Sequence, residues 1–266
     1  MHSETNPLAI ELVNVEKTFG RQKVLKGVNL PVAAGKTTVI VGGSGQGKSV
    51  ILKHMLGLMR PDQGEVRVFG RDLARLKKRE LYEVRKDYGV LFQNVALFDS
   101  MTVFDNVALP LRQRTKLSEK QIAQNVEEKL ALMALEGAAG KYPAQISGGM
   151  QKRVGLARAL ALDPKIVFFD EPTTGLDVHK SNEIYRLFHA TQERLGYTAV
   201  IVSHDVPKIF KLADHVALMA GGEVQGRMSP EDFQRSSNPL IKQFVQVTMG
   251  PIYTNESAEA ATRETV

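Results

Sequence analysis

The chain has 266 residues, of which 43% are hydrophobic, 24% are charged and 6% are aromatic. Such a chain can bury one sizeable core, or a core with a small subdomain, which excludes intrinsic disorder and a coiled coil. The sequence contains no cysteine, which excludes a disulfide framework, thiolate metal sites and cysteine catalysis and favours a reducing compartment. Its net charge of +6 is compatible with nucleic acid, anionic lipid or phosphorylated ligands and does not choose among them.

Membrane-spanning and targeting segments are not predicted. No apolar run approaches the roughly 18–20 residues that a helix needs to cross a bilayer. Residues 1–7 have neither a basic head before an apolar stretch nor an Arg-rich amphipathic face. We therefore expect a chain that works in the cytosol and does not itself cross a membrane.

Apolar patterns along the chain predict two kinds of strand. Apolar and polar residues alternate at 10–15, 28–32 and 65–69, as in an antiparallel layer with one buried face. Continuous apolar runs are typical of strands buried on both faces of a parallel sheet. They occur at 38–41, 90–92, 166–169, 199–202 and 215–219. Helical patterns such as 180–195 separate several of these runs, so we expect an α/β fold with an antiparallel β subdomain.

The stretch from about 94 to 164 contains no convincing strand pattern. Ser118 and Gln121 form a capping-box pattern ahead of apolar residues at helical spacing, so this stretch predicts a helical insert in the α/β core. Residues 248–266 contain too little apolar area to order themselves. We expect one domain over residues 8–247, followed by a flexible C-terminal tail.

The strongest local signal is the sequence GGSGQGKS at residues 42–49, which matches the phosphate-loop pattern G-x-x-x-x-G-K-[ST] directly after a predicted strand. Glycines let backbone N–H groups close around phosphates, and the helix expected at 50–58 presents its positive N-terminal end to the same anion. Lys48 supplies a positive charge and Ser49 a ligand for Mg²⁺. The alternative, a glycine-rich turn without a ligand, is disfavoured by the strand–loop–helix order. The predicted phosphate-binding residues are Gly42, Gly43, Ser44, Gly45, Gln46, Gly47, Lys48, Ser49 and Val50.

Two consecutive carboxylates, Asp170 and Glu171, follow the apolar run at 166–169. Ligand chemistry in α/β sheets lies at the carboxyl ends of strands, so we expect Asp170 near Mg²⁺. Glu171 points the other way and is placed to polarise the water that attacks a γ-phosphate, because phosphoryl transfer requires an oriented nucleophile. A helix N-cap is the alternative role of Glu171, and the phosphate loop favours the catalytic role.

Ser147, Gly148 and Gly149 precede a helical pattern and offer small residues, exposed N–H groups and a helix dipole to a further phosphate. In isolation, these residues are more typical of a capped helix start. In their order and spacing with the phosphate loop and the two carboxylates, they resemble the ATP-binding subunits of ABC transporters. The resemblance covers roughly residues 8–247 and implies ATP as ligand, Mg²⁺ as cofactor and ATP hydrolysis. Met150 departs from the family, because most relatives have Gln there and Met cannot donate the same hydrogen bonds.

The resemblance also assigns four residues outside these motifs. It implies that Phe19 stacks on the adenine and that Gln93 approaches Mg²⁺ and couples the site to a permease. It places Asp177 in the loop that approaches the nucleotide, and it implies that His204 contacts the γ-phosphate. The implied catalytic residues are therefore Glu171, His204 and Lys48, and the implied metal residues are Ser49, Gln93 and Asp170. A core Phe, a solvated Gln and a structural His are the alternatives.

A dimer and several partners are further implications of the resemblance. Each of two ATP molecules would lie between the phosphate loop of one subunit and Ser147 and Gly149 of the other. Segments 91–98, 101–112 and 202–207 resemble the Mla/Mce-associated (MlaF-like) lipid-transport ATPases. That subgroup implies an MlaE-like permease and an MCE-domain protein, and it leaves a small STAS-domain subunit open. It also implies a peripheral subunit on the cytoplasmic face of the inner membrane of a Gram-negative cell.

Two other functions are weighed against lipid transport. The core motifs occur equally in importers of polar amino acids or other small solutes, which therefore remain the alternative. A soluble ABC ATPase that acts on nucleic acid or ribosomes has only the +6 charge in its favour. Such proteins commonly join two ATPase units or insert long coiled coils, and this sequence has neither, so we expect no nucleic-acid partner.

Overall fold

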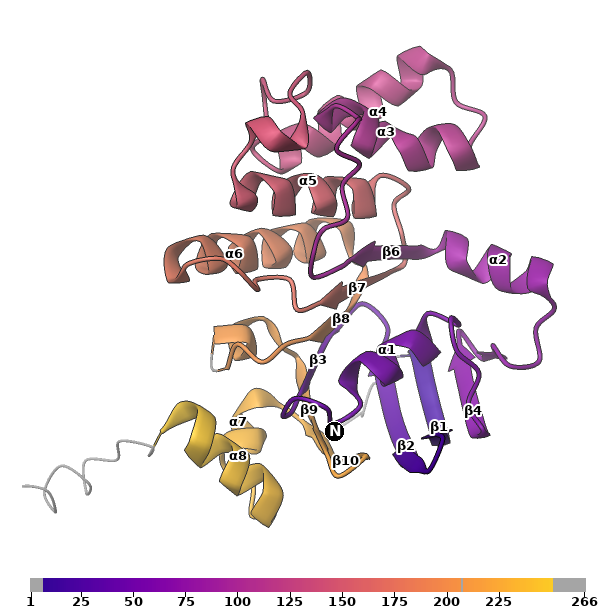
Figure 1. The fold of residues 1–266 in the computed structure, drawn as a ribbon, viewed down its shortest axis with the longest axis vertical. Coiled ribbons are helices and arrows are strands. Elements are labelled where there is room, and N and C mark those ends of the chain that lie inside the picture. Colours follow the sequence, from indigo (N-terminus) through magenta and orange to yellow (C-terminus); the bar gives the residue numbers. More distant parts are fainter. Residues whose placement is uncertain (1–6, 207, 251–266) are drawn as a thin grey trace, which may run out of the picture.

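Two sheets organise the protein in the computed structural model, which describes residues 7–206 and 208–250 (Figure 1). The strands are β1 (Leu8–Phe19), β2 (Gln22–Ala33), β3 (Thr37–Val41), β4 (Gln63–Val68), β5 (Arg71–Asp72), β6 (Tyr88–Leu91), β7 (Ile166–Asp170), β8 (Thr198–Val202), β9 (His215–Ala220) and β10 (Glu223–Met228). The smaller sheet is antiparallel, in the order β2-β1-β4-β5. The larger sheet has the order β10-β9-β3-β8-β7-β6, and all its neighbours are parallel except β10 and β9. The predicted fold class is confirmed.

The helices cover both faces of the larger sheet. They are α1 (Lys48–Met55), α2 (Lys78–Lys86), α3 (Val103–Arg114), α4 (Glu119–Leu132), α5 (Gly148–Leu160), α6 (Val178–Leu195), α7 (Pro230–Gln234) and α8 (Pro239–Met249), with short 3-10 helices η1 (Pro143–Gln145) and η2 (Lys208–Leu212). On one face of the larger sheet lie α5 and α6, with α3 and α4 packed beyond α5. On the opposite face, α1 lies between the two sheets (Figure 1). Within the described part of the chain, no helix is long and apolar enough to span a bilayer.

Alternate residues of the central strands enter two separate hydrophobic cores. Phe168 of β7 and Val200 of β8 pack in the core with α1 and the antiparallel sheet. Their neighbours Phe169 and Ile201 pack in the other core, with α3, α5 and α6. Successive side chains of a strand point to opposite faces, so a strand buried on both faces must be apolar at every position. This explains the continuous apolar runs in the sequence.

Several details differ from the prediction. Helix α1 begins at Lys48 rather than at residue 50, because Gly47 takes a left-handed conformation (φ 100°) as its N-cap and places the next two residues in the first turn. Strand β10 was not predicted, since an edge strand with Gly and charged residues lacks the apolar run of a central strand. Helix α8 continues to Met249, so the first two residues of the predicted tail belong to the fold. The rest of that predicted tail, 251–266, lies outside the described residues.

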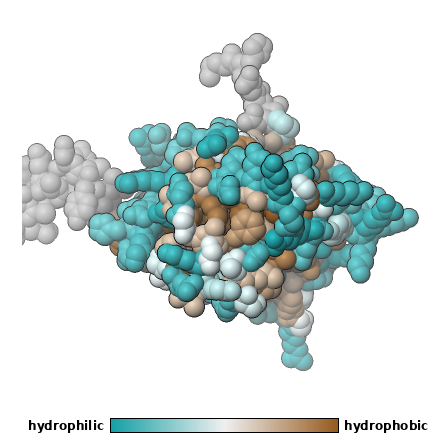
Figure 2. Space-filling model, turned by 90° about the horizontal axis from the view of Figure 1, so that it is seen from above, coloured by the Kyte–Doolittle hydropathy of each residue, from teal (hydrophilic) through white to brown (hydrophobic). Residues whose placement is uncertain are grey.

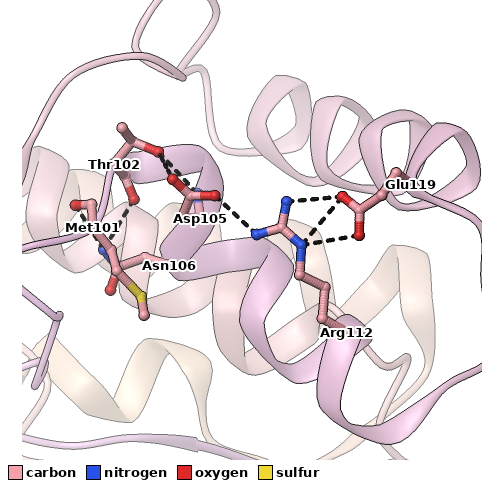
Figure 3. A network of polar contacts seen from close by, with 6 residues as sticks. All are labelled: Met101, Thr102, Asp105, Asn106, Arg112 and Glu119. Atoms are coloured by element: carbon pink, nitrogen blue, oxygen red, sulfur yellow. Dashed lines mark hydrogen bonds and ion pairs between the residues drawn. The ribbon is translucent and has the colours of Figure 1, made fainter.

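A buried amide fixes the start of the helical insert (Figure 3). Asn106 of α3 is fully buried, and its side-chain oxygen accepts a hydrogen bond from the backbone N–H of Phe98 at 2.8 Å. Its side-chain nitrogen donates to the carbonyls of Phe98, Met101 and Thr102 at 3.0–3.2 Å. The loop that leaves β6 is thereby attached to the first turn of α3, because every one of these backbone groups is paired by this single side chain.

An exposed arginine joins the first two helices of the insert (Figure 3). Arg112 of α3 donates from Nη1 to Asp105 at 2.9 Å and from Nη2 to Glu119, the first residue of α4, at 2.8 Å. Figure 2 looks onto this end of the molecule, where hydrophilic side chains surround a smaller hydrophobic area. Arg112 is exposed, so solvent screens its ion pairs, in contrast to the buried side chain of Asn106.

The two side chains give a prediction for stability. Asn106→Ala should lower the free energy of unfolding by about 1–3 kcal/mol, because it leaves backbone groups unpaired in a buried place. Arg112→Ala, from the same network, should stay close to the parent because exposed ion pairs contribute little. Urea unfolding followed by circular dichroism measures both. Equal stabilities of the Asn106→Ala protein and the parent would contradict this interpretation.

Candidate functional site

The phosphate loop connects the end of β3 to the start of α1, and its conformation requires glycine. Gly42 has φ 149°, and a Cβ at this position would lie 2.2 Å from the carbonyl oxygen of Met219 on β9. Lys48 Nζ donates to the carbonyls of Gly42 at 2.8 Å and Gly43 at 2.9 Å. Gln46 Oε1 accepts a hydrogen bond from the backbone N–H of Gly221 at 2.7 Å. The loop is thus held by its own lysine and by the turn after β9.

Charges of both signs are half-buried next to this loop. Burial lowers the pKa of Lys48, and the negative charges of Glu171 and Asp170 oppose that shift. Burial raises the pKa of Asp170, against the positive charges of Lys53 and Lys48. Both shifts arise because removal from water penalises a charged form. The site therefore gathers a lysine and two carboxylates in a place of low solvation, where a further anion and cation interact strongly.

Glu171 and His204 lie just after two neighbouring strands, and their side chains contact each other. Glu171 directly follows β7, and His204 lies two residues after β8. Glu171 Oε2 lies 2.6 Å from His204 Nδ1 and 3.3 Å from the backbone nitrogen of the same histidine. The backbone of Glu171 is in the left-handed region (φ 48°), which is uncommon for a residue other than glycine. The two predicted catalytic side chains are therefore brought into contact by the sheet.

A cavity of about 510 Å³ brings six of the predicted site residues together. Its lining consists of Gly42, Gly43, Ser44, Lys48, Glu171 and His204, with Phe244 and Thr248 from α8. The phosphate loop forms one wall and the carboxylate–histidine pair another. A phosphate group in this cavity would meet a lysine, loop backbone and a histidine at once.

The other predicted residues lie outside this cavity. Phe19 is at the end of β1 and is 44% exposed as a residue, with Lys17 Nζ 5.8 Å from its ring centre. Ser147, Gly148 and Gly149 form the start of α5, where the Ser147 hydroxyl caps the helix by accepting from the N–H of Met150. The equivalent position of α6 is held by Asp177, whose carboxylate accepts from the N–H of Lys180 at 2.9 Å. One chain alone therefore does not unite all the predicted ATP-binding residues.

The backbone around Gln93 is held by two basic residues of α5. Lys152 is buried and donates from Nζ to the carbonyl of Gln93, and Arg158 donates to the carbonyls of Val95 and Ala96. Burial lowers the pKa of Lys152. The Gln93 residue itself is exposed, outside the cavity at the phosphate loop. This segment is thereby fastened to the helix that Ser147 begins.

Sequence reasoning missed the contribution of α8 to the site. Phe244 and Thr248 line the cavity, although residue 248 was assigned to the tail and no motif marks this helix. The available signal was the Asn238–Pro239 pair, because Asn is a favoured N-cap and Pro a favoured first helical residue. Asn238 does cap α8, accepting from the N–H of Leu240 at 2.9 Å. The Asn238–Pro239 pair predicts that a helix begins here, but it does not predict that this helix packs beside the phosphate loop.

Two of the residues predicted to bind Mg²⁺, Ser49 and Asp170, lie beside the phosphate loop. Ser49 is exposed in the first turn of α1, and Asp170 is the last residue of β7. In the described ranges, no three or more His, Cys, Asp or Glu side chains gather where they could hold a metal ion. At nucleotide sites Mg²⁺ takes one or two protein ligands together with phosphates and water. A hydroxyl and a carboxylate beside a phosphate loop fit that requirement.

Comparisons with known proteins place the chain in a family. The profile described as "ABC transporter" matches residues 25–174. The intermembrane phospholipid transport system ATP-binding protein MlaF of Haemophilus influenzae is 40% identical over 97% of this chain and 98% of that protein. The probable ribonucleotide transport ATP-binding protein mkl of Mycobacterium tuberculosis is 40% identical over 96% of this chain and 71% of that protein.

The solved structures agree with this placement. A dimeric ATP-binding cassette, bound to ADP and Pi in a post-hydrolysis state, has a TM-score of 0.75 and 34% identity, over 83% of this chain and 98% of that one. The match to the family profile extends from β2 through the phosphate loop and α5 to the residues after β7. This chain therefore belongs to the ABC transporter family, as an ATP-binding subunit that hydrolyses ATP.

Proposed function

We propose that this ATPase powers a transporter that moves phospholipid or a related lipid between the membranes of a Gram-negative envelope. The observation that carries the proposal is the 40% identity to the H. influenzae phospholipid-transport protein over 97% of this chain and 98% of that protein. The mycobacterial protein named for ribonucleotide transport has the same 40% sequence identity to this chain, but the match covers only 71% of its length. Import of a small polar solute is therefore the second candidate.

The proposed partners are an MlaE-like permease and an MCE-domain protein, with a small STAS-domain subunit as an optional third. A surface beside Gln93 supports a membrane partner. A cavity of about 280 Å³ lies there, and its lining includes the exposed aromatic residues Phe92 and Phe98, with Pro110 of α3. Exposed aromatic side chains around a concave surface are typical of protein interfaces. We place the chain as a peripheral subunit on the cytoplasmic face of the inner membrane.

We assign the hydrolysis step to the groups that meet in the cavity at the phosphate loop. Glu171 accepts a proton from the attacking water, and Lys48 stabilises negative charge on the β- and γ-phosphates. His204 approaches Glu171 through Nδ1, so its other ring nitrogen, Nε2, is the one that we assign to the γ-phosphate. Bound Mg²⁺ would neutralise phosphate charge, held by Ser49 and Asp170 with Gln93 in approach.

The proposed ATP site is completed by a second copy of the chain. Ser147 and Gly148 are exposed at the N-terminal end of α5, where free N–H groups and the helix dipole attract a phosphate. They lie outside the cavity at the phosphate loop of their own chain. A symmetric dimer brings them to the partner's nucleotide, and the dimeric state of the related cassette supports this arrangement. Phe19 would stack on the adenine, and Asp177 would lie at the dimer contact.

The proposed mechanism gives a prediction for the general base. Glu171→Gln should lower kcat for ATP hydrolysis by at least about 100-fold, because an amide cannot accept the proton of the attacking water. ATP binding should persist, so the variant should accumulate as an ATP-bound dimer in light scattering. Steady-state phosphate release measures the rate.

Glu193→Gln is the matched control for this variant. Glu193 also faces a histidine, His189, at 3.7 Å, on an exposed part of α6 away from the cavity. This control should hydrolyse ATP at the parent rate. A Glu171→Gln protein as active as the parent would refute the assigned mechanism.

A further prediction concerns partners and cargo. Affinity capture of the tagged chain from detergent-solubilised membranes should recover a polytopic permease and an MCE-domain protein with bound phospholipid. Mass spectrometry of proteins and extracted lipids provides the readout. A strain that lacks the chain should also become sensitive to detergent.

Other outcomes of the capture separate the alternatives. A permease recovered with a solute-binding protein would move the assignment to small-solute import. Recovery of no membrane protein, together with ATP turnover that nucleic acid stimulates in low salt, would refute both transport functions.

A further inference from the structure

A buried phenol on α6 connects two loops of the site and takes no part in the proposed reaction. Tyr185 is 4% exposed. Its hydroxyl donates to Asp205 Oδ2 at 2.9 Å and lies 2.8 Å from the hydroxyl oxygen of Thr173. Thr173 lies two residues after Glu171, and Asp205 directly follows His204. The bridge therefore joins the segment of the general base to the segment of the histidine.

The chemistry of the three groups fixes the direction of the bridge. Burial raises the pKa of Tyr185, so the phenol keeps its single proton. An ionised carboxylate only accepts hydrogen bonds, so this proton goes to Asp205. The hydroxyl of Thr173 must then donate to the Tyr185 oxygen. Each donor has one acceptor, and the chain of bonds runs from the loop after β7 to the loop after β8.

The far end of the bridge is itself anchored. The backbone N–H of Asp205 donates to the Ser203 hydroxyl at 3.0 Å, and the other carboxylate oxygen lies 3.4 Å from Lys208 Nζ. Ser203 is fully buried at the end of β8. Asp205 is therefore held by three contacts, with Ser203, Lys208 and Tyr185. Because Tyr185 also contacts Thr173, the position of Thr173 depends on that of Asp205.

One backbone hydrogen bond also joins the two segments, from the Glu171 N–H to the Val202 carbonyl at 2.9 Å, but it lies at the start of both loops. A cavity of about 290 Å³ lies between them, and both Thr173 and Asp205 line it. The second side-chain link is the pair of Glu171 and His204. In the proposed reaction Glu171 accepts a proton from the water and His204 binds the γ-phosphate through Nε2. The link between these two side chains therefore consists of reacting groups, whereas the buried bridge involves none.

We propose that Tyr185 is a positioning residue, which holds the loops of Glu171 and His204 at a fixed separation while their side chains engage the nucleotide. The inference rests on the proposed roles of these two residues. It predicts an effect on the chemical step and little effect on ATP binding, because Tyr185 lies outside the lining of the cavity at the phosphate loop. Small displacements of groups that must be aligned cost large factors in rate.

A second buried tyrosine supplies a matched control. Tyr197 is 2% exposed, and its hydroxyl lies 2.9 Å from the hydroxyl of Thr191 in α6. It precedes β8, at the end of the strand opposite to the loop of His204. Tyr185→Phe and Tyr197→Phe each remove one buried phenolic hydroxyl and its hydrogen bonds. Both variants should therefore show a similar decrease in melting temperature. Only the first connects the two loops of the site.

The test measures ATP turnover of the affinity-captured complex with each variant. Tyr185→Phe should lower kcat about tenfold with KM for ATP within about twofold of the parent, and Tyr197→Phe should leave both within about twofold. Thr173→Val removes the other half of the bridge. Its effect on kcat should not add to that of Tyr185→Phe, because the two residues act through one connection.

Three outcomes would overturn the inference. They are equal kcat values for the two tyrosine variants, a rise in KM with unchanged kcat for Tyr185→Phe, and additive effects of Thr173→Val. Glu171→Gln in the same assay separates this inference from the proposed function. An inactive Glu171→Gln protein with a parent-like Tyr185→Phe protein refutes the positioning role alone. A fully active Glu171→Gln protein refutes the proposed mechanism and the inference with it.

Discussion

The parallel register of β3, β8 and β7 is the constraint on which the rest of the site depends. Ile40 pairs with Val202, and Val202 pairs with Asp170, so the three strands end at one level of the sheet. The phosphate loop, the two carboxylates and His204 follow directly from these ends. A shift of one strand by one residue relative to its neighbours would turn its side chains to the opposite faces of the sheet. It would also move the site residue at the end of that strand away from the other site residues. Burial on both sides of the sheet therefore fixes the site as well as the core.

This register explains the electrostatics of the site. Lys48 begins α1 and Asp170 ends β7, and both are half-buried beside the core. Burial lowers the pKa of Lys48 and raises the pKa of Asp170, which favours the neutral form of each. The attraction between their charges opposes both shifts. Polyphosphate and a divalent cation would add charges of both signs to the same place, so their binding would satisfy groups that burial leaves poorly solvated. The energetic cost of a buried charged site is thereby offset by its ligand.

The sequence predicted the parts of this arrangement that are local. The phosphate loop, Asp170 and Glu171 are recognisable because each follows a continuous apolar strand, and the Ser118 capping box marks α4 as the structure has it. The contact between Glu171 and His204 needs the strand order β7-β8, which the composition of two separate segments does not contain. The buried Lys152 could not be predicted either, since a lysine is normally exposed and its carbonyl acceptor lies 59 residues away.

The helical insert is attached to the core by bonds of a different kind. Gly155 of α5 allows close approach, since a Cβ there would lie 2.4 Å from Val95 Cγ1. On either side of this glycine, Lys152 and Arg158 bind the carbonyls of the segment around Gln93. Ser147 begins the same helix. One helix therefore carries both Ser147 at its N-terminal end and the two basic residues that hold the segment around Gln93. If the proposed dimer forms, α5 connects the shared nucleotide site to the surface at which we place the membrane partner.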